Sequence, residues 1–308
     1  MDIQVSIIIV NYNTEEVLKD CLLSIREHTS DIAYETIVID NNSEKGSLDH
    51  LIESFPEVNF QLLDKNWGFG QANNIASEIA KGKYLYFLNP DTTLLNNAAQ
   101  ILAEYMDNHP QTGICGGSMF NEDGSHTSSY YDISHIKLEY EILFNIRKNY
   151  QGINELGKPK EVQVIVGSNL LIQKNIFEEV GKFDKDFFMY FEEIELCDRV
   201  RKKGYKIVSV PDAKIMHLHG ASGENKNEDL KKWTREEHWY SKFIYFTKTK
   251  GQLQAKLLHS AHVVKFMLAV SFYKIRKNCN KLEYWTLKRQ SMEKAYDRYK
   301  IYLKELPQ

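Results

Sequence analysis

The chain has 308 residues, a net charge of −3, and 43% hydrophobic and 26% charged residues. This composition is typical of a globular protein with one large domain and an appendage, or with two modest domains. No apolar run reaches the ~18 residues of a membrane-spanning helix, and the opening residues predict a first strand rather than a signal peptide. The four cysteines are widely spaced without a C-x-x-C pair. Their spacing argues against a disulfide framework or a cysteine zinc site and favours a reducing cytoplasm.

Charge is distributed unevenly along the chain. Residues 223–308 carry 19 Lys and Arg against 9 Asp and Glu, a net of +10, whereas residues 1–222 carry a net of −13. This asymmetry indicates two parts with separate roles, an acidic body and a basic C-terminal extension.

The first 117 residues alternate short apolar runs with stretches whose apolar residues recur at helical spacing. Five runs predict short buried strands: Val5–Val10, Thr36–Asp40, Asn59–Leu63, Tyr84–Leu88 and Gly113–Gly117. Four stretches between them predict helices: Glu15–His28, Leu48–Phe55, Gln71–Ala80 and Asn97–Asn108. This βαβα order predicts an α/β fold with a Rossmann-like, mainly parallel sheet that carries helices on both faces.

The following residues are less regular. Asn121–Tyr131 is rich in Ser, Asp, Gly and Tyr and predicts a loop, whereas Gln163–Gln173 predicts another strand. Ile194–Lys203 predicts a helix, and Lys206–Val210 predicts a late strand. Beyond residue 223, Gly and Pro nearly vanish, and aromatic and basic residues at helical spacing predict a helical extension.

The tripeptide Asn89-Pro90-Asp91 directly follows the predicted strand Tyr84–Leu88. An acidic residue at a strand end lies at the carboxyl edge of a sheet, where open α/β folds bind ligands. The Asp91 carboxylate could hold a divalent cation that neutralises a diphosphate. The alternative is an ordinary Asp in a turn.

The first two predicted strands also end in short polar residues, Asn11-Tyr12-Asn13 and Asp40-Asn41-Asn42-Ser43. Asp40 could accept a hydrogen bond from the N3–H of a pyrimidine, while backbone near Tyr12 reads the carbonyls of the base. The alternative is that Asp40 and Asn42 are turn or N-cap residues, which their types favour.

The segment from Asn66 to Asn74 includes Gly68 and Asn73 and opens a predicted helix. Its glycines allow close approach of a ligand, and a helix start offers free N–H groups to a ribose or diphosphate. The spacing is not G-x-G-x-x-G and contains no P-loop, so neither a Rossmann dehydrogenase nor a P-loop NTPase is supported.

Taken in order, these motifs resemble glycosyltransferase family 2, and within it the rhamnosyltransferase-like bacterial enzymes of the GT-A fold. The likeness continues with Gly167-Ser168-Asn169, similar to the acceptor-side strand of the family, and with the segment from Gly181 to Glu193, similar to the one that carries the catalytic acid pair. His217-x-x-Gly220-x-Ser222 resembles the late histidine motif. The resemblance covers roughly residues 4–223.

The resemblance implies an inverting glycosyltransferase that moves a sugar from a nucleotide-sugar donor to a glycan or lipid-linked glycan. L-Rhamnose from dTDP-rhamnose is the first expectation, and a UDP-hexose is the second. It implies a catalytic domain over residues 1–222, with a nucleotide-sugar half (1–117) and an acceptor half (118–222), and a separate extension over 223–308. The donor residues would be Asn11, Tyr12, Asn13, Asp40, Asn42, Asn66, Gly68, Asn73, Asn89 and Asp91.

Two residues depart from the usual family pattern. The family commonly has Asp-x-Asp where this chain has Asn89, so Asp91 is the only carboxylate of the cation motif. The acid pair is commonly Glu-Asp, and here it is Glu192-Glu193. The resemblance implies that this pair carries the catalytic base, and we expect Glu193 to be the base and Glu192 to support it. The apolar residues just before the pair would raise the pKa of a carboxyl, which suits a base. The alternative is that both acids simply begin a helix.

His217 and His219 lie two residues apart and would share one face of a strand. With Asp91 and two phosphate oxygens, one imidazole could complete a site for Mn²⁺ or Mg²⁺. The motif register favours His217, with His219 as the alternative ligand. Further along the predicted helix, Asp198 and Arg199 are expected on a solvated face.

Two other functions are considered. A nucleotidyltransferase would be expected to carry a glycine-rich basic loop after the first strand, where this chain has Asn11–Glu16. A non-catalytic nucleotide-sugar binding module would be supported by loss of the acids, yet Asp91 and Glu193 are present. No nucleic-acid module is recognisable, and the acidic body would repel a nucleic-acid backbone.

Within the basic extension, His262–Ile275 is apolar and flanked by Lys265, Lys274, Arg276 and Lys277. Such a pattern suits a helix that lies in a membrane interface. The expected location is therefore the cytoplasm, peripheral on the inner face of the cell membrane through residues 259–308. The alternative is a helical bundle that packs on the core or forms a homodimer.

Overall fold

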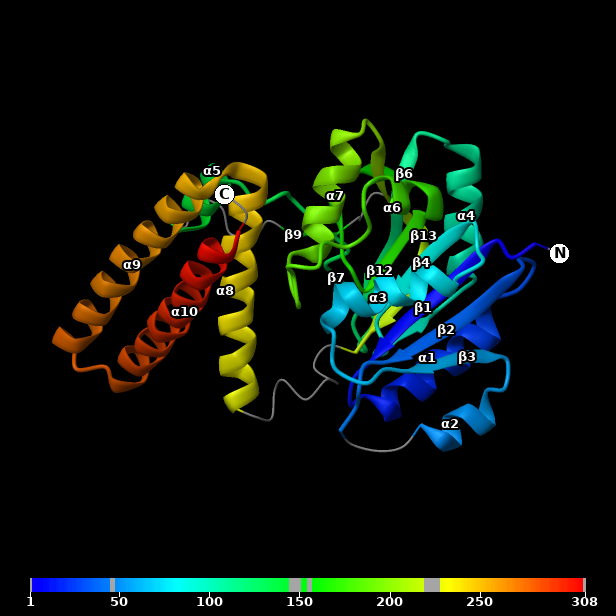
Figure 1. The fold of residues 1–308 in the computed structure, drawn as a ribbon, viewed down its shortest axis with the longest axis horizontal. Coiled ribbons are helices and arrows are strands. Elements are labelled where there is room, and N and C mark those ends of the chain that lie inside the picture. The colour runs from blue at the N-terminus through cyan, green and yellow to red at the C-terminus, as the bar shows by residue number, and fades with distance from the viewer. Residues whose placement is uncertain (1, 45–47, 144–150, 154–156, 219–227, 307–308) are drawn as a thin grey trace. The chain divides into compact units, whose positions relative to one another are not determined.

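The structure is a computed structural model that describes residues 2–44, 48–143, 151–153, 157–218 and 228–306. The chain forms two compact units (Figure 1). Unit 1 consists of Met1–Ile133, Gln151–Lys185 and Glu192–Ser222, and unit 2 consists of Ser134–Tyr150, Asp186–Phe191 and Gly223–Gln308.

Unit 1 begins with the expected alternation of strands and helices. Its first part contains β1 (Val5–Asn11), α1 (Glu15–His28), β2 (Tyr34–Asp40), α2 (Asp49–Ser54), β3 (Val58–Leu62), α3 (Gly68–Ile79), β4 (Tyr84–Leu88), β5 (Thr92–Leu94), α4 (Ala98–Asn108) and β6 (Thr112–Phe120). Its second part contains β7 (His126–Thr127), β8 (Tyr130–Tyr131), β9 (Gln151–Gly152), β10 (Lys160–Glu161), β11 (Val164–Ile165), β12 (Asn169–Gln173), α6 (Lys174–Glu179), α7 (Glu192–Lys202) and β13 (Lys206–His217).

The main sheet has the strand order β10-β13-β6-β12-β4-β1-β2-β3. Neighbours β4, β1, β2 and β3 are parallel, as are β6 and β13, whereas β12 runs antiparallel to both β4 and β6. The mainly parallel sheet expected from the βαβα order is therefore confirmed. Because β12 is inserted in the opposite direction, its start lies beside the carboxyl end of β4.

Helices cover both faces of this sheet (Figure 1). Alternate residues of β1 and β4, such as Ile7 and Tyr86, pack in one core with α1, α2 and α4. On the opposite face, α3 contacts β1 and β2. There the ring of Phe87 on β4 lies 5.3 Å from Phe177 on α6 and 5.2 Å from Phe183. Burial on both faces explains why β1 and β4 are continuous apolar runs.

Three expected strands and one expected loop differ from the structure. The run Gln163–Gln173 is two strands, because β11 pairs with β8 in a separate three-stranded sheet, while β12 joins the main sheet. The expected loop Asn121–Tyr131 contains the short strands β7 and β8. The strand expected at Asn59–Leu63 is β3, which is half-buried to exposed because it has a single neighbour at the sheet edge.

The late strand expected at Lys206–Val210 extends to His217 as β13. Its pairing with β6 changes register between Val210 and Lys214. Pro211 lies within this interruption, where its missing N–H removes no regular ladder hydrogen bond. Beyond it, β13 pairs with β5, which aligns His217 with Thr92.

Asp198 and Arg199 do not lie on a solvated face, contrary to the expectation. Asp198 is buried and its carboxylate contacts the ammonium of Lys202 at 2.7 Å. The Arg199 guanidinium donates to Glu195 and to the backbone carbonyls of Val180 and Lys182. Arg199 thus ties α7 to the segment that precedes the acid pair.

Unit 2 contains α5 (Ile136–Leu143), α8 (Glu228–Lys250), α9 (Gln252–Ile275) and α10 (Cys279–Glu305). The helices α9 and α10 lie side by side, joined by a short turn (Figure 1). A buried ion pair between Lys242 and Glu139, with Nζ and Oε2 at 3.0 Å, ties α8 to α5. Among the described residues, no helix is both long and apolar enough to cross a membrane.

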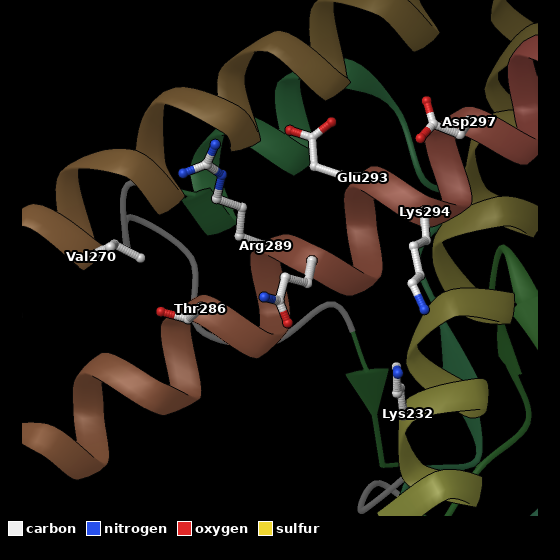
Figure 2. Close-up of a pocket in the computed structure, with 8 residues that line it drawn as sticks. Lys232, Val270, Thr286, Arg289, Glu293, Lys294 and Asp297 are labelled. Carbon is white, nitrogen blue, oxygen red and sulfur yellow. The ribbon is translucent and has the colours of Figure 1, made fainter.

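A pocket in unit 2 opens between α8, α9 and α10 (Figure 2). Lys232 of α8 and Val270 of α9 line it together with residues of α10, namely Thr286, Arg289, Gln290, Glu293, Lys294 and Asp297. Its lining carries charges of both signs.

Candidate active site

Polar side chains from adjacent parallel strands meet at the carboxyl edge of the main sheet. Asn11 at the end of β1 is in register with Asp40 at the end of β2, and β4 on the other side of β1 leads into Asn89-Pro90-Asp91. The sheet therefore brings together candidate donor residues that lie on separate strands.

Asp40 is buried and lies in a hydrogen-bond network. Its Oδ1 accepts from Asn11 Nδ2 at 2.7 Å and from Ser43 Oγ at 2.6 Å, and its Oδ2 accepts from the Ser43 N–H at 3.1 Å. A carboxylate has about four acceptor positions, so Asp40 keeps acceptor capacity beyond these three bonds. The network fixes the carboxylate at the sheet edge.

The residues beside this network adopt turn geometry. Asn13 and Asn42 have φ values of 57° and 63°, a left-handed conformation that Asn tolerates better than most residues. Asn13 also accepts a hydrogen bond from the Glu44 N–H at 2.9 Å. Tyr12 is exposed.

Asn41 joins the two parts of the candidate donor site and was not among the predicted site residues. Its Nδ2 donates to Asn66 Oδ1 at 2.9 Å, and its Oδ1 accepts from the Trp67 N–H at 2.9 Å. Asn66 in turn accepts from the Gly68 N–H at 2.9 Å. The position of Asn41 between two polar candidates was the signal that could have identified it.

The start of α3 approaches the acid-pair segment closely. A Cβ added to Gly70 would lie 3.1 Å from Cβ of Phe183 and 3.7 Å from Cβ of Glu192. Asn73, a predicted donor residue, is buried on α3 and donates to the Phe69 carbonyl at 3.0 Å. The structure therefore places Asn73 in the helix packing rather than at the strand ends.

Asp91 and His217 form a pair at this edge. The Asp91 Oδ1 and His217 Nε2 atoms are 3.2 Å apart, and the Leu218 N–H donates to the Asp91 carbonyl at 2.9 Å. Two ligands of one octahedral cation with bonds of about 2.1 Å are separated by roughly 3.0 Å. The spacing and the carboxylate–imidazole chemistry therefore fit Mn²⁺ or Mg²⁺.

An octahedral cation takes further oxygen ligands, which water or the phosphate oxygens of a bound substrate can supply. In the part of the chain that the structure describes, no group of three or more His, Cys, Asp or Glu residues forms a metal site. The alternative ligand His219 lies outside the described residues.

The acid pair lies in the first turn of α7. Glu192 is buried, and Glu193 is half-buried with an Oε2 that has no hydrogen-bond partner among the described residues. Burial raises the pKa of the Glu193 carboxyl to about 7, although hydrogen bonds from the backbone N–H groups of Glu193 and Ile194 oppose the shift. A carboxyl group with this pKa can accept a proton near neutral pH.

The backbone just before the acid pair is strained. Tyr190 and Phe191 have φ values of 69° and 70°, which are unfavourable for aromatic residues. Within unit 2, the ring of Phe191 packs 5.2 Å from His238 and 5.5 Å from Tyr245. Conformations of this kind cost about 1–3 kcal/mol and concentrate at functional sites.

The segment Gly167-Ser168-Asn169 lies between the loop that carries Asp91 and the acid pair. The Asn89 N–H donates to the Ser168 carbonyl at 3.4 Å, and a Cβ at Gly167 would lie 3.5 Å from Cβ of Glu193. Asn169 is fully buried, accepts from Tyr86 Oη at 2.9 Å and donates to the Gly117 carbonyl at 3.1 Å. Asn169 therefore supports this segment from the core.

Asn74 holds the acid-pair segment against α3 and was also not among the predicted site residues. Its Nδ2 donates to the Phe183 carbonyl at 2.8 Å, and its Oδ1 accepts from the Phe183 N–H at 3.0 Å. The side chain thus pairs both backbone groups of one residue across 109 positions of sequence. Asn in the middle of a predicted helix, where its propensity is low, was the available signal.

Residues 6–181, more than half of the chain, match the sequence profile of the family described as Glycosyl transferase family 2. The chain belongs to this family. It is a glycosyltransferase, and the edge described above is its candidate active site.

Among the relatives of this glycosyltransferase are three rhamnosyltransferases. The dTDP-rhamnosyl transferase RfbF of Shigella flexneri is 29% identical over 223 residues, covering 71% of each chain. The rhamnosyltransferase WbbL of Escherichia coli is 26% identical and covers 69% of this chain and 83% of the relative. The N-acetylglucosaminyl-diphospho-decaprenol L-rhamnosyltransferase of Mycobacterium tuberculosis is 26% identical, covering 59% of this chain and 65% of the relative.

Two solved structures resemble the fold of the glycosyltransferase. GalNAc-T7, solved with UDP, GalNAc and Mn²⁺, has a TM-score of 0.58 and 18% identity over 82% of this chain, which spans about half (51%) of that protein. The mannosyltransferase PcManGT of Pyrobaculum calidifontis, solved with GDP-Man and Mn²⁺, has a TM-score of 0.55 and 14% identity, covering 97% and 87% of the two chains. These likenesses confirm the expected GT-A fold.

We predict that Asn74 is a positioning residue for the acid pair. In Asn74→Leu, the buried backbone groups of Phe183 lose their partners, which costs about 1–3 kcal/mol for an unpaired group. The variant should melt at a lower temperature and show a reduced kcat. The midpoint of its kcat/KM profile against pH should also shift, because the surroundings of Glu193 change.

The matched control is Glu78→Gln on the same helix. Glu78 is exposed and pairs with Lys182, which belongs to the same segment, but an exposed ion pair contributes little to stability. Its pH profile should match that of the wild type. An unshifted profile in Asn74→Leu would limit Asn74 to a structural role.

Proposed function

We propose that the protein is an inverting glycosyltransferase that transfers L-rhamnose from dTDP-rhamnose to a glycan or lipid-linked glycan. The proposal is carried by the Asp91–His217 pair at the carboxyl edge of the sheet and by a carboxyl, Glu193, whose pKa is about 7. The segment Gly167-Ser168 links the two, because the Ser168 carbonyl accepts from the Asn89 N–H and Gly167 lies beside Glu193. The Asp91–His217 pair would supply a place for a nucleoside diphosphate, and Glu193 would supply a base for the acceptor hydroxyl.

The names of the relatives support the proposed donor and acceptor. All three name rhamnosyl transfer, one of them specifies the dTDP donor, and another includes a diphospho-decaprenol carrier. A UDP-hexose remains the alternative donor, because thymine and uracil offer the same N3–H and carbonyl pattern to Asp40. Family membership favours glycosyl transfer over the nucleotidyltransferase and binding-module alternatives.

In the proposed donor complex, Asp40 accepts the hydrogen bond of the pyrimidine N3–H, and the backbone near Tyr12 contacts the base carbonyls. Asn11, Asn13 and Asn42 shape this base site. Asn66, Gly68 and the start of α3 support the ribose and diphosphate, because an α-helix N-terminus offers N–H groups to anions. Asn73 holds this helix start from within, through its hydrogen bond to the Phe69 carbonyl. Residues 1–117 are the nucleotide-sugar half and residues 118–222 the acceptor half of the proposed catalytic domain.

Asp91 and His217 would hold Mn²⁺ or Mg²⁺, which supplies positive charge to the leaving diphosphate. Asn89 precedes Asp91 and donates its backbone N–H to the Ser168 carbonyl, so it positions the loop.

The chemical step is a single displacement. The acceptor oxygen forms a bond to the anomeric carbon while the bond from that carbon to the diphosphate oxygen breaks, and the configuration inverts. The leaving nucleoside diphosphate keeps the bonding electron pair, and Glu193 takes the proton of the acceptor hydroxyl. Glu192 lies next to the base in the first turn of α7 and supports its placement, while Gly167 leaves space beside the base for the acceptor.

A panel of nucleotide sugars tests the donor assignment. With the purified protein and Mn²⁺, we expect faster release of nucleoside diphosphate from dTDP-rhamnose than from UDP-hexoses or GDP-mannose, and little release after chelation. Faster release from a UDP-hexose would replace the donor, and no release from any donor with a range of glycan acceptors would contradict the proposal.

Removal of the Asp91 carboxylate should abolish turnover. Asp91→Ala deletes the only carboxylate of the cation pair but leaves the strand pairing of β5 and β13 intact, so the fold should survive. Calorimetry with the nucleoside diphosphate and Mn²⁺ should show loss of metal-dependent binding. The control is Asp20→Ala on the exposed face of α1, which should bind like the wild type. Unchanged metal-dependent binding in Asp91→Ala would contradict the cation assignment.

Replacement of the base should affect the rate more than donor binding. Glu193→Gln should lower kcat by about 10²–10⁴-fold with donor affinity nearly intact, whereas Glu192→Gln should be milder. In the wild type, kcat/KM should rise with pH through about 7, because Glu193 must lose its proton to act as a base. If the effects of the two substitutions are exchanged, Glu192 is the base.

The same group should make stability depend on pH. The pKa of Glu193 is raised from 4.5 to about 7 in the folded protein, so folding loses stability as pH rises between these values. Glu193→Gln should therefore show a smaller fall in Tm between pH 5 and 8 than the wild type. An identical fall would mean that Glu193 does not carry the shift.

A further inference from the structure

One side of α9 presents a continuous apolar stripe to solvent. The exposed residues of this α9 stripe are Leu253, Leu257, Val264, Met267, Leu268, Phe272 and Ile275. Most are separated by four or seven positions, which places them on one side of a helix. Leu268 and Ile275 are 66% and 82% exposed, while the opposite side of α9 buries Ala255, Leu258 and Phe266 in unit 2.

Basic residues surround the α9 stripe. Lys256 and Lys274 lie along it, and Arg276 and Lys277 lie in the turn that follows; all four are exposed. The Arg276 guanidinium also packs over the ring of Phe272, 5.3 Å from its centroid. Residues 252–289 carry eight Lys and Arg and one acidic residue. The apolar surface therefore lies in a region with a net charge of +7.

This charge selects among the possible occupants of the stripe. Two copies of the chain that paired through α9 would bring two surfaces of the same sign together, which is unfavourable. A nucleic acid would match the charge but would leave Leu, Val and Ile side chains without apolar contacts. The surface of an anionic bilayer offers both negative headgroups and an acyl boundary to such a helix.

We propose that the α9 stripe is a docking surface for anionic membranes. The helix lies in the plane of the interface, and the aliphatic side chains of Val264, Leu268 and Ile275 enter the acyl boundary. The basic side chains that surround the stripe contact anionic headgroups. The pocket between α8, α9 and α10 is not part of this surface, and its cations lie beside the acids Glu293 and Asp297 (Figure 2).

Vesicle binding by the full chain tests the charge component. The protein should co-sediment with vesicles of phosphatidylcholine and phosphatidylglycerol, bind phosphatidylcholine alone more weakly, and dissociate as salt screens the charges. Lys274→Gln/Arg276→Gln should weaken binding by about 30-fold, because each basic residue at an anionic surface contributes about 1 kcal/mol. The control Lys19→Gln/Lys81→Gln removes two exposed lysines of unit 1 and should bind like the wild type.

A second pair of variants tests the apolar component. Leu268→Gln/Ile275→Gln should weaken binding to anionic vesicles by about tenfold or more, because both side chains lose apolar burial. Leu62→Gln is the matched control, since Leu62 is 64% exposed on the edge strand β3. All four substituted proteins should keep the wild-type Tm, because the changed side chains are exposed.

Two outcomes would overturn the proposal. Equal recovery in the supernatant with neutral and anionic vesicles at low salt would exclude a membrane surface. A wild-type dimer in sedimentation equilibrium that Leu268→Gln/Ile275→Gln converts to monomer would assign the stripe to a second copy. Neither outcome depends on the sugar donor, because vesicle binding and oligomeric state are measured without substrate.

Discussion

The candidate site depends on one long-range pairing, that of β13 with β5. The pairing places His217 opposite Thr92 and so brings its imidazole to 3.2 Å from the Asp91 carboxylate, although 126 positions separate the two residues. It requires β13 to continue beyond Pro211, and the register change between Val210 and Lys214 permits this. Without that continuation, Asp91 would lack the His217 imidazole, and the proposed cation site would consist of one carboxylate on a loop.

Local sequence patterns were sufficient for the parallel half of the fold. The apolar runs of β1 and β4 are buried on both faces of the sheet, so their composition alone identifies them as strands. Because parallel strands end at the same edge, the polar residues that follow them, such as Asn11 and Asp40, could be grouped from their positions in the chain alone. The order of the motifs then indicated the family.

Features that depend on distant partners could not be predicted in the same way. The run from Gln163 to Gln173 has the composition of one strand, and only its pairing with β8 and β4 divides it between two sheets. Asp198 and Arg199 have the composition of a solvated helix face, but Arg199 finds carbonyl acceptors at Val180 and Lys182. Asn74 has a low helix propensity, which marks it as unusual in a predicted helix, but only its pairing with Phe183 gives it a role.

The proposed base, Glu193, lies in local surroundings that are unfavourable for an ionised carboxyl, while more distant hydrogen bonds hold the segment that precedes it. A half-buried carboxyl with a raised pKa destabilises the folded state once it is ionised, and the left-handed backbone at Tyr190 and Phe191 adds further strain. The side chains of Asn74 and Arg199 donate to the backbone carbonyls of Phe183 and Lys182, and so fix the segment that precedes this strained turn. Because Asn74 and Arg199 are not among the proposed reacting groups, they can hold Glu193 in surroundings that raise its pKa, as the proposed base needs near neutral pH.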